Sequence, residues 1–568
     1  MADSPIPTAS HLSGHLAEAA QAWLAQDPDP LTARELASLL DAARGGDNEA
    51  IAELTDAFDG SLQFGTAGLR GKLGPGSNRM NRVVVARAAA GLARYLLGRH
   101  GHEGLRVVIG YDARRNSDVF ARDTARIMAG AGITAMVLPR ALPTPVLAFA
   151  IRELLCAAGV MVTASHNPPD DNGYKVYLGD GSQIVAPADA DIAECIAGIG
   201  PVGSIAEADD WLVLDGAVVD SYVSRALALL LPGPRKLSVV YTALHGVGGD
   251  VFMRVAGDAG WGRPSTVAAQ FDPDARFPTV SFPNPEEPGA MDLALAEAHA
   301  RQADIIIAND PDADRCAVGI RTDNNHRMLS GDEVGALIGW WIVERARRAR
   351  QPLDGVYAQS IVSSDLLQRI AADAGLGYVA TLTGFKWIAR VPQLRFGYEE
   401  ALGYCVDPDA VKDKDGITAS LLMLELAATL KAEGRGPQDI LDELAQRYGL
   451  YATSQLSVRV PDRTQIFGTM ARLRAAPPTE IGGRRVLALD DLEKGCGGLP
   501  PTDGLRFLME EARVIIRPSG TEPKLKCYLQ IVLPVEGEVH QARAAARIRP
   551  AEALRVDRTA APGNCAAS

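Results

Sequence analysis

The sequence predicts an α/β protein of several domains with largely parallel sheets. The chain has 568 residues, more than one hydrophobic core usually serves, and domains of roughly 100–200 residues would give about three to five units. From residue 82 onward, apolar strand patterns alternate with helical patterns, which is typical of βαβ units. Several of these strands end in polar loops, where parallel sheets place ligands.

The composition is ordinary for a globular protein and limits its partners. Hydrophobic residues make up 47% and charged residues 22% of the chain. The formal net charge of −13 argues against nucleic acid or an anionic membrane as the main partner. The N-terminus lacks a signal-peptide layout, no apolar run approaches about 18 residues, and the seven cysteines form no CxxC pair. We therefore expect a cytoplasmic protein with reduced thiols.

The first unit is expected to begin with two helices and to continue as a βαβ series. Leu16, Ala20 and Trp23 recur at helical spacing, and Thr32 with Glu35 forms a capping-box pattern. A glycine-rich stretch with Arg70 follows, either as a loop that lets an anion approach the backbone or as a plain connection. The expected elements are helix 82–97, strand 105–111, helix 118–131, strand 133–138 and strand 156–162.

The strand over 156–162 stops at Thr163-Ala164-Ser165-His166-Asn167-Pro168-Pro169. The paired prolines forbid a helix or a central strand beyond it, so Ser165 is expected to be presented and not buried. A simple Ser/Asn-rich turn is the alternative. Next, Asn172-Gly173 predicts a hairpin turn, and the alternating residues after it carry Lys175 near the serine loop.

The strand over 304–308 runs into Asn309-Asp310-Pro311-Asp312-Ala313-Asp314-Arg315. Three carboxylates at alternate positions repel one another unless a divalent cation neutralises them, and hard oxygen ligands suit Mg²⁺ or Mn²⁺. An EF-hand would need Gly and Glu where this chain has Arg315 and Arg321. The pattern favours a metal site, with an acidic surface loop as the alternative.

Two later loops also carry candidate binding groups. Adjacent Glu399 and Glu400 cannot share one face of a strand, so one can accept hydrogen bonds from a polyol while the other faces water. Residues 517–526 combine an arginine, two hydroxyls, a glycine amide and lysines, either as an oxyanion cradle or as a basic turn.

These four loops, in this order, resemble the signature loops of the α-D-phosphohexomutase family, which includes phosphoglucomutases and phosphomannomutases. The resemblance covers about 64–533 and looks closest to the phosphoglucomutase/phosphopentomutase branch. It implies a four-domain architecture with three mixed-sheet α/β domains and a smaller C-terminal α+β domain around one central cleft. The implied bounds are 1–215 for the helical lead-in and domain I, 216–325 for domain II, 326–455 for domain III, 456–546 for domain IV and 547–568 for a loosely ordered tail.

The resemblance implies an isomerase that interconverts sugar 1-phosphate and 6-phosphate, with glucose or mannose as the sugar. A phosphoserine enzyme and a bisphosphate intermediate, which is also the activator, would carry the reaction. The resemblance also implies one Mg²⁺ per chain. The enzyme would be a monomer or a homodimer, with no nucleic acid or membrane partner. A phosphopentomutase acting on ribose 1- and 5-phosphates is the alternative. Ala401 stands where hexose-selective members often carry serine, so the sugar remains open.

The resemblance also assigns roles to individual residues. Ser165 would carry the phosphoryl group, with Arg70 steadying it and Lys175 or Lys386 as general acid/base. Tyr404 replaces a histidine of some relatives, which leaves the acid/base open. The remaining implied residues are His166 near the serine, Asp310, Asp312 and Asp314 with Ser165 around the metal, Arg315, Thr383, Gly384 and Glu399 at the sugar, and Arg517, Ser519, Gly520 and Thr521 at the second phosphate.

Two readings of other classes compete with this one. In a haloacid-dehalogenase-type phosphatase, Asp310 would be the nucleophile and Asp312 the acid, which leaves the Ser165 and Arg517 loops unexplained. A non-enzymatic sugar-phosphate sensor would bind its ligand without turnover.

Overall fold

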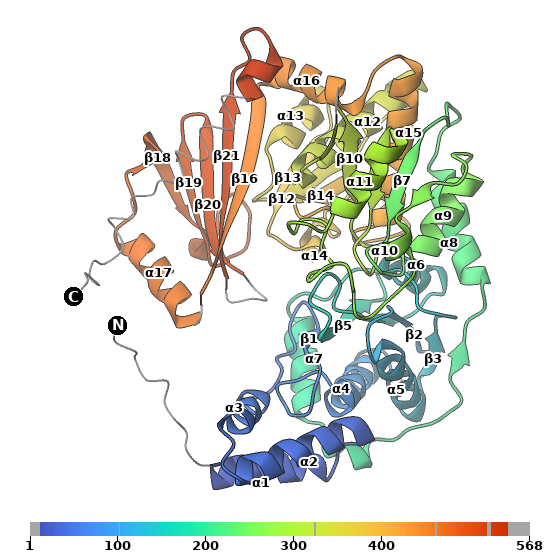
Figure 1. The fold of residues 1–568 in the computed structure, drawn as a ribbon, viewed down its shortest axis with the longest axis vertical. Helices are drawn as coiled ribbons and strands as arrows, with labels where there is room; N and C mark the ends of the chain where they lie inside the picture. The colour runs from blue at the N-terminus through green and yellow to red at the C-terminus, as the bar shows by residue number, and fades with distance from the viewer. Residues whose placement is uncertain (1–11, 102, 323–324, 461–462, 520–523, 544–568) are drawn as a thin grey trace. The chain divides into compact units, whose positions relative to one another are not determined.

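The computed structural model describes residues 12–543, apart from 102, 323–324, 461–462 and 520–523. The chain divides into two compact units, whose course is drawn in Figure 1. The first unit comprises Met1–Met328 and Gly403–Thr429, and the second comprises Leu329–Leu402 and Leu430–Ser568. Within the described residues, no helix combines the length and the apolar character needed to cross a membrane.

Three short helices open the first unit. Ser13, Asp29 and Asp47 each accept backbone N–H groups of the helix that follows, which satisfies donors that the first helical turn leaves free. Trp23 and Leu40 pack in one apolar cluster with α4. The two predicted lead-in helices are confirmed, but the predicted capping box of Thr32 and Glu35 is wrong, because α2 begins at Pro30 with Asp29 as its N-cap. Helix α3 was not expected. The bounds are α1 Gly14–Leu24, α2 Pro30–Arg44, α3 Asn48–Ala57 and α4 Arg82–His100.

A six-stranded mixed sheet follows, with strand order β1-β5-β4-β2-β3-β6. Strands β2, β3, β4 and β6 are parallel, whereas β5 is antiparallel to its neighbours β4 and β1. Helices α5 and α6 both contact β2 and β4, and every residue of β4 is buried. The bounds are β1 Leu69–Lys72, β2 Arg106–Tyr111, β3 Thr134–Val137, β4 Ala158–Val162, β5 Asp171–Leu178, β6 Leu212–Val213, α5 Ser117–Gly130, α6 Thr144–Glu153, α7 Ala188–Ala197 and a 3₁₀ turn Val202–Ser204.

Asn172-Gly173 lies inside β5, so the predicted hairpin turn is wrong. Gly173 pairs with Arg70 of β1. A Cβ atom at Gly173 would lie 2.5 Å from the carbonyl oxygen of Thr163, so close backbone packing, and not a turn, requires the glycine. The strand still carries Lys175 as predicted.

A five-stranded mixed sheet completes the first unit, with order β11-β10-β9-β7-β8. Strands β7, β8 and β9 are parallel, and β10 and β11 add an antiparallel edge. Buried β9 ends directly before the acidic loop. The bounds are β7 Val239–Thr242, β8 Ser265–Thr266, β9 Ile305–Ala308, β10 Ala317–Arg321, β11 His326–Met328, β15 Gly403–Cys405, α8 Ala217–Ala228, α9 Gly249–Asp258, α10 Ala268–Phe271, α11 Asp292–Arg301 and α15 Gly416–Ala432, whose last turn passes into the second unit.

The second unit begins with an α/β region in which β12 lies between β13 and β14 and is parallel to both. Helix α12 starts at a capping box in which Ser330 and Glu333 exchange hydrogen bonds. The bounds are α12 Gly331–Arg348, β12 Val356–Ser360, α13 Leu366–Asp373, β13 Gly377–Thr381, α14 Phe385–Ile388, β14 Leu394–Glu399 and α16 Pro437–Tyr448.

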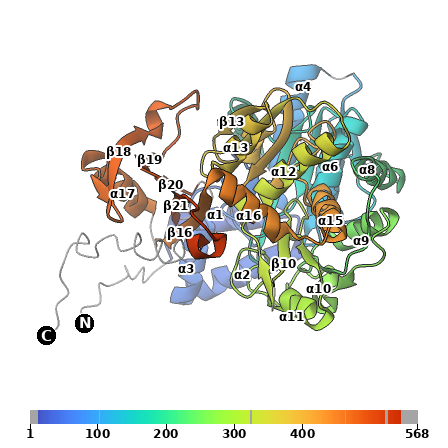
Figure 2. The same ribbon diagram turned by 90° about the horizontal axis from the view of Figure 1, so that it is seen from above.

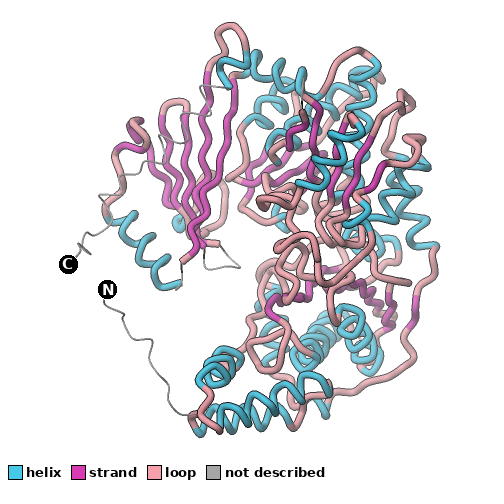
Figure 3. Tube along the Cα trace, in the orientation of Figure 1, coloured by secondary structure: helices cyan, strands magenta, loops and turns pink. Residues whose placement is uncertain are grey.

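A six-stranded antiparallel sheet forms the rest of the second unit, with order β16-β21-β20-β19-β18-β17. Its long strands are drawn in magenta in Figure 3. Helix α17 covers one face, where Ile466 and Met470 meet Phe507 and Val514 (Figures 1 and 2). This agrees with the α+β character predicted for the last part of the chain. The bounds are β16 Leu450–Arg459, α17 Arg463–Ala475, β17 Glu480–Ile481, β18 Arg484–Asp491, a 3₁₀ turn Leu492–Lys494, β19 Leu505–Met509, β20 Ala512–Pro518 and β21 Lys524–Leu533.

Candidate active site

Ser165 lies just beyond the carboxyl end of β4, in a sharp turn. Its φ is +52°, and its amide donates a hydrogen bond to Thr163 Oγ1 at 2.8 Å. The prediction of a serine that is not buried is wrong, because only 3% of Ser165 is exposed. Its hydroxyl donates to Asp310 Oδ2 at 2.9 Å and lies 3.1 Å from Nδ1 of His166. The serine therefore faces a polar site built from both sheets of the first unit.

Arg114 holds the serine turn in place. Its Nη2 donates to the carbonyl oxygens of Ser165 and Asn167, both at 2.6 Å. Its Nη1 donates to the carbonyl oxygens of Pro168 at 2.7 Å and Asp171 at 3.1 Å. One buried guanidinium thus hydrogen-bonds to four carbonyl groups between Ser165 and the first residue of β5.

Asp112 and Phe277 in turn fix Arg114. Asp112 Oδ2 lies 3.5 Å from Arg114 Nε and accepts the Thr163 hydroxyl at 2.6 Å. The guanidinium carbon lies 4.9 Å from the centre of the Phe277 ring, a cation–π distance. Because Thr163 also accepts the Ser165 amide, one buried network sets the position of the serine.

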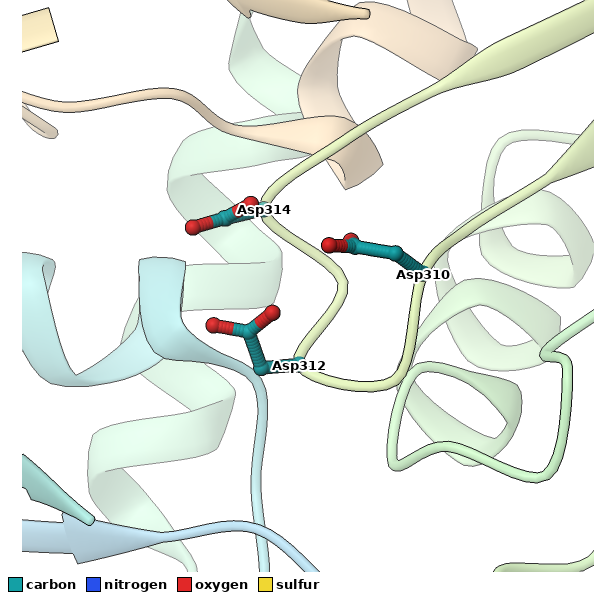
Figure 4. Close-up of side chains that lie close together, drawn as sticks. All are labelled: Asp310, Asp312 and Asp314. Carbon is teal, nitrogen blue, oxygen red and sulfur yellow. The ribbon is translucent and has the colours of Figure 1, made fainter. Parts of the chain in front are cut away.

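Asp310, Asp312 and Asp314 follow β9 and have no exposed surface. Figure 4 shows their carboxylates directed into a common space beside the loop. Each offers one oxygen, and the three oxygens lie within 4.8 Å of one another. Burial raises the pKa values of Asp310 and Asp312, and the charge of Asp314 raises them further. Such a cluster needs positive charge close by.

Two lysines supply part of that charge. Lys175 Nζ donates to Asp312 Oδ2 at 2.7 Å and to Asp314 Oδ2 at 3.0 Å, and Lys414 Nζ lies 3.0 Å from Asp314 Oδ2. Burial opposes the ionised form of Asp314, yet Lys175, Lys414 and Arg315 hold its pKa below the usual value. Burial likewise opposes the charge of Lys175, but Asp312 and Asp314 raise its pKa, so this lysine is a cation.

The donor set fits a divalent metal ion. Asp312 Oδ1 and Asp314 Oδ1 are buried and find no hydrogen-bond partner among the described residues. The other oxygen of Asp312 is taken by Lys175 and by the Thr144 hydroxyl at 2.6 Å. Unpartnered buried anionic oxygens are costly, and carboxylate oxygens are the ligands that Mg²⁺ prefers.

Arg70, His166 and Arg315 surround the serine turn. Arg70 Nη1 donates to Asn167 Oδ1 at 3.0 Å, and Arg315 Nη2 lies 3.4 Å from His166 Nε2. Burial lowers the pKa of His166 well below its usual value, and the charges of Arg315 and Arg70 lower it further. The imidazole is therefore neutral and has one nitrogen able to accept a proton.

The predicted sugar loop lies in the second unit. Glu399 ends β14, is 9% exposed, and accepts the N–H of Gly384 on Oε1 at 2.7 Å. Gly384 adopts a φ of +117° immediately before α14. Thr383 and Lys386 flank this glycine in the chain, so the structure brings Glu399 to the segment that carries them.

Glu400 is the more exposed of the two adjacent acids and is partly buried, and the sequence did not predict which of the two faces water. Glu400 Oε2 accepts the hydroxyl of Ser363 at 2.7 Å, and its amide donates to the same hydroxyl oxygen at 3.1 Å. Burial raises the pKa of Glu400 to about 7, with Glu399 and Asp332 adding to the rise.

The predicted phosphate loop lies at the end of β20, also in the second unit. Arg517 hydrogen-bonds to the hydroxyl of Tyr528. The Ser519 amide donates to the carbonyl oxygen of Lys524 at 2.8 Å. Gly520 and Thr521 lie outside the described residues. The described candidate residues thus form one group in the first unit and another in the second.

Three residues of the first group were missed from the sequence. Arg114, Thr144 and Lys414 each contact the serine turn or the aspartates. Arg114 follows the end of β2 by three residues, as Ser165 follows β4, so a search of the loop after each parallel strand would have found it. Lys414 follows no parallel strand, and the sequence around it reads only as a turn before a helix.

A buried serine hydroxyl beside three carboxylates, at the carboxyl ends of strands from two α/β sheets, is the kind of site that phosphoryl-transfer enzymes use. Comparison with models of known protein families identifies the family within this class. Phosphoglucomutase/phosphomannomutase alpha/beta/alpha domains I, II and III match residues 61–201, 221–323 and 330–448, and the C-terminal domain matches 457–553. The chain therefore belongs to the phosphoglucomutase/phosphomannomutase family and is an isomerase of the phosphosugar mutase type.

Individual relatives agree with the family and differ in the sugar that they name. A probable phosphomannomutase of Haemophilus influenzae is 49% identical over 457 residues, covering 79% of this chain and 92% of that protein. A probable phosphoribomutase of Schizosaccharomyces pombe is 35% identical over 556 residues, covering 90% and 93%. The crystal structure of a putative phosphomannomutase from Thermus thermophilus has a TM-score of 0.67 at 25% identity and covers 86% of this chain and 99% of that one.

Proposed function

We propose that this enzyme interconverts glucose 1-phosphate and glucose 6-phosphate, with mannose phosphates as further substrates and Ser165 as the phosphoryl carrier. The contact that carries this proposal joins Ser165 Oγ to Asp310 Oδ2 at 2.9 Å. It places a hydroxyl able to bear a phosphoryl group against the carboxylates that would hold a metal ion.

The proposed reaction has two mirrored transfers. The phosphorylated Ser165 meets a sugar 1-phosphate, a P–O bond to O6 forms while the P–Oγ bond breaks, and the O6 proton passes to a base. The resulting 1,6-bisphosphate turns over within the site. A P–Oγ bond then forms while the P–O1 bond breaks, and the stored proton returns to O1. Sugar 6-phosphate leaves, and the phosphorylated serine is regenerated. Free sugar bisphosphate would prime Ser165 in the same way.

The residues around Ser165 have distinct parts in this scheme. His166 is neutral, and its Nδ1 lies 3.1 Å from Oγ, so we assign it to holding the proton, with Lys386 as the second candidate. Lys175 is a cation bound to two carboxylates, so we assign it to charge neutralisation in preference to the acid/base role that the resemblance implies. Arg70 would steady the phosphoryl oxygens.

Asp310, Asp312 and Asp314, with an oxygen on Ser165, would hold one Mg²⁺. When bound, the cation would polarise the phosphoryl group and neutralise charge as it develops. Phosphoryl transfer depends mainly on positioning and on such charge stabilisation.

The recognition residues are proposed from the same resemblance. Glu399 would accept sugar hydroxyls, with Thr383, Gly384 and Arg315 as further contacts. The non-transferring phosphate would bind the end of β20 and the loop that follows it, through Arg517, Ser519, Gly520 and Thr521. The six cysteines within the described residues are free thiols, which suits the proposed cytoplasmic location.

A phosphopentomutase is the second candidate. Two observations favour it: the 35% identity to a probable phosphoribomutase over 90% of this chain, and the alanine at position 401, which offers no hydroxyl to a hexose.

Turnover of glucose 1-, mannose 1- and ribose 1-phosphates tests the proposal, with Mg²⁺ and a trace of the matching bisphosphate present. We expect the largest kcat/KM with glucose 1-phosphate. A larger value with ribose 1-phosphate would favour the pentomutase. Binding without turnover of any of the three would reject the mutase in favour of a sensor.

A further inference from the structure

The hydroxyl of Ser363 hydrogen-bonds to both the backbone amide and the side chain of Glu400. Ser363 has no exposed surface and lies three residues beyond the end of β12. Its hydroxyl donates to Glu400 Oε2 at 2.7 Å and accepts the Glu400 amide at 3.1 Å. The start of α12 also packs closely against Glu400, because a Cβ atom at Gly331 would lie 1.8 Å from the Glu400 carbonyl oxygen.

The segment around Ser363 is clamped to the antiparallel sheet. Arg513 Nη2 donates to the Ser363 carbonyl at 2.6 Å, and its Nη1 donates to Asp365 Oδ1 at 2.7 Å. Gln530 Nε2 donates to Asp365 Oδ2 at 2.8 Å, and the Asp365 amide donates to Gln530 Oε1 at 2.9 Å. Arg513 and Gln530 pair across β20 and β21, so two adjacent strands hydrogen-bond to the loop that follows β12.

An apolar seam runs beside these polar contacts. Ile361 and Val362 pack with Ile515 and Tyr528. Ile515 lies on the strand that carries Arg517, and the Tyr528 hydroxyl is hydrogen-bonded to Arg517. A continuous, largely buried path therefore joins the strand of the phosphate loop to Glu400, the residue after Glu399.

We propose that Ser363 and Glu400 are positioning residues that set the spacing between the sugar-hydroxyl site at Glu399 and the phosphate site at Arg517. This inference rests on the proposed function. A hexose 6-phosphate is one carbon longer than a pentose 5-phosphate, so a fixed spacing favours one length of substrate. A loosened spacing accepts both lengths with less discrimination.

The charges around Glu400 make its contribution depend on pH. The groups that face it are Glu399 on β14, Asp332 on α12, Tyr398, Tyr528 on β21 and, through Ser363, Arg513 on β20. A charged Glu400 accepts the Ser363 hydroxyl more strongly than a neutral group does. The pair should therefore hold most firmly above neutral pH.

Steady-state kinetics of Ser363→Ala with glucose 1-phosphate and ribose 1-phosphate test the inference. The matched control is Ser364→Ala, because Ser364 is also buried but its hydroxyl accepts the Leu366 amide at 3.3 Å and does not meet Glu400. Ser363→Ala should raise the KM for the preferred sugar about tenfold with little change in kcat, as loss of uniform binding does. It should also reduce the hexose-to-pentose ratio of kcat/KM, and Ser364→Ala should leave both unchanged.

Two further variants separate positioning from mere support of the fold. Arg513→Lys, which loses the two-pronged grip, should shift the sugar ratio in the same direction but less. Glu400→Gln should match the wild-type KM near pH 6 and exceed it a few-fold near pH 8.

The inference would be overturned if Ser363→Ala and Ser364→Ala had equal hexose-to-pentose ratios of kcat/KM. It would also be overturned if the ratio of the KM of Glu400→Gln to that of wild type did not vary with pH. A wild-type enzyme that turns over no sugar phosphate would instead overturn the proposed function.

Discussion

The Ser165 turn of the first unit and the Glu399 loop of the second both follow buried strands, but they satisfy carboxylates in different ways. The aspartates around Ser165 meet the side chains of Lys175 and Lys414. Glu399 and Glu400 instead meet a backbone amide and a serine hydroxyl. Opposing charges are gathered at the first site, whereas neutral donors orient the acids at the second.

This difference corresponds to two tasks. A site that moves a phosphoryl group needs charge fixed before the reaction, because reorganising charge during it is costly. A site that recognises sugar hydroxyls needs carboxylates that are oriented but not consumed by ion pairs. The difference agrees with the proposed function, in which the first unit carries the chemistry and the second recognises the sugar.

Removing the hydroxyl of Ser165 should have the largest effect. Ser165→Ala is expected to lower kcat by about 10⁴-fold or more, because the group that accepts the phosphoryl is lost. A coupled mutase assay measures this. Ser364→Ala, a buried serine of the second unit, should keep wild-type activity. Activity of Ser165→Ala within tenfold of wild type would place the chemistry elsewhere.

Removing the charge of Lys175 should destabilise the metal-free protein by about 3–5 kcal/mol, because it leaves Asp312 and Asp314 uncompensated in a buried site. Urea unfolding of Lys175→Met in the presence of EDTA measures this. Lys72→Met is the matched control, since the Lys72–Glu53 pair at 3.4 Å is largely exposed and such pairs contribute only about 0–1 kcal/mol. Equal losses in the two variants would contradict the charge balance described for the first unit.

The acid pair of the second unit should respond to pH. The native pKa of Glu400 is raised to about 7 from 4.5, so the native state binds this proton more tightly than the unfolded state does. The contribution of this proton to the free energy of unfolding is fully present below about pH 4.5 and is lost as the pH rises through about 7. The total loss is up to about 3 kcal/mol. Glu400→Gln should therefore be more stable than wild type at pH 8 and similar to it at pH 5 in urea unfolding. A stability difference that is the same at both pH values would contradict this.

Divalent metal should stabilise the first unit and not the second. Mg²⁺ at about one hundred times its Kd would stabilise the folded state that binds it by about 2.7 kcal/mol. Hydrogen exchange with and without Mg²⁺ should show stronger protection in β9 and the serine turn, and none in β12–β14. Asp314→Asn should abolish the gain. Protection spread equally over both units would contradict a metal site confined to the first unit.

The part of the site that follows strand patterns was predictable from the sequence. Ser165 and the three aspartates stand where apolar strands stop abruptly, and the structure brings them into contact. Asn172-Gly173 was misread because a glycine that admits a neighbouring backbone has the same sequence signature as a turn glycine. Lys414 reaches Asp314 from a segment about 100 residues away, which is tertiary information that no local pattern contains.

Transfer of ³²P from a labelled sugar bisphosphate to the protein tests the central claim most directly. We expect label on the peptide that contains Ser165. Asp310→Asn should still acquire this label after longer incubation, whereas Ser165→Ala should acquire none. Label that persists in Ser165→Ala and disappears in Asp310→Asn would make Asp310 the nucleophile, as in a haloacid-dehalogenase-type phosphatase, and would contradict the account.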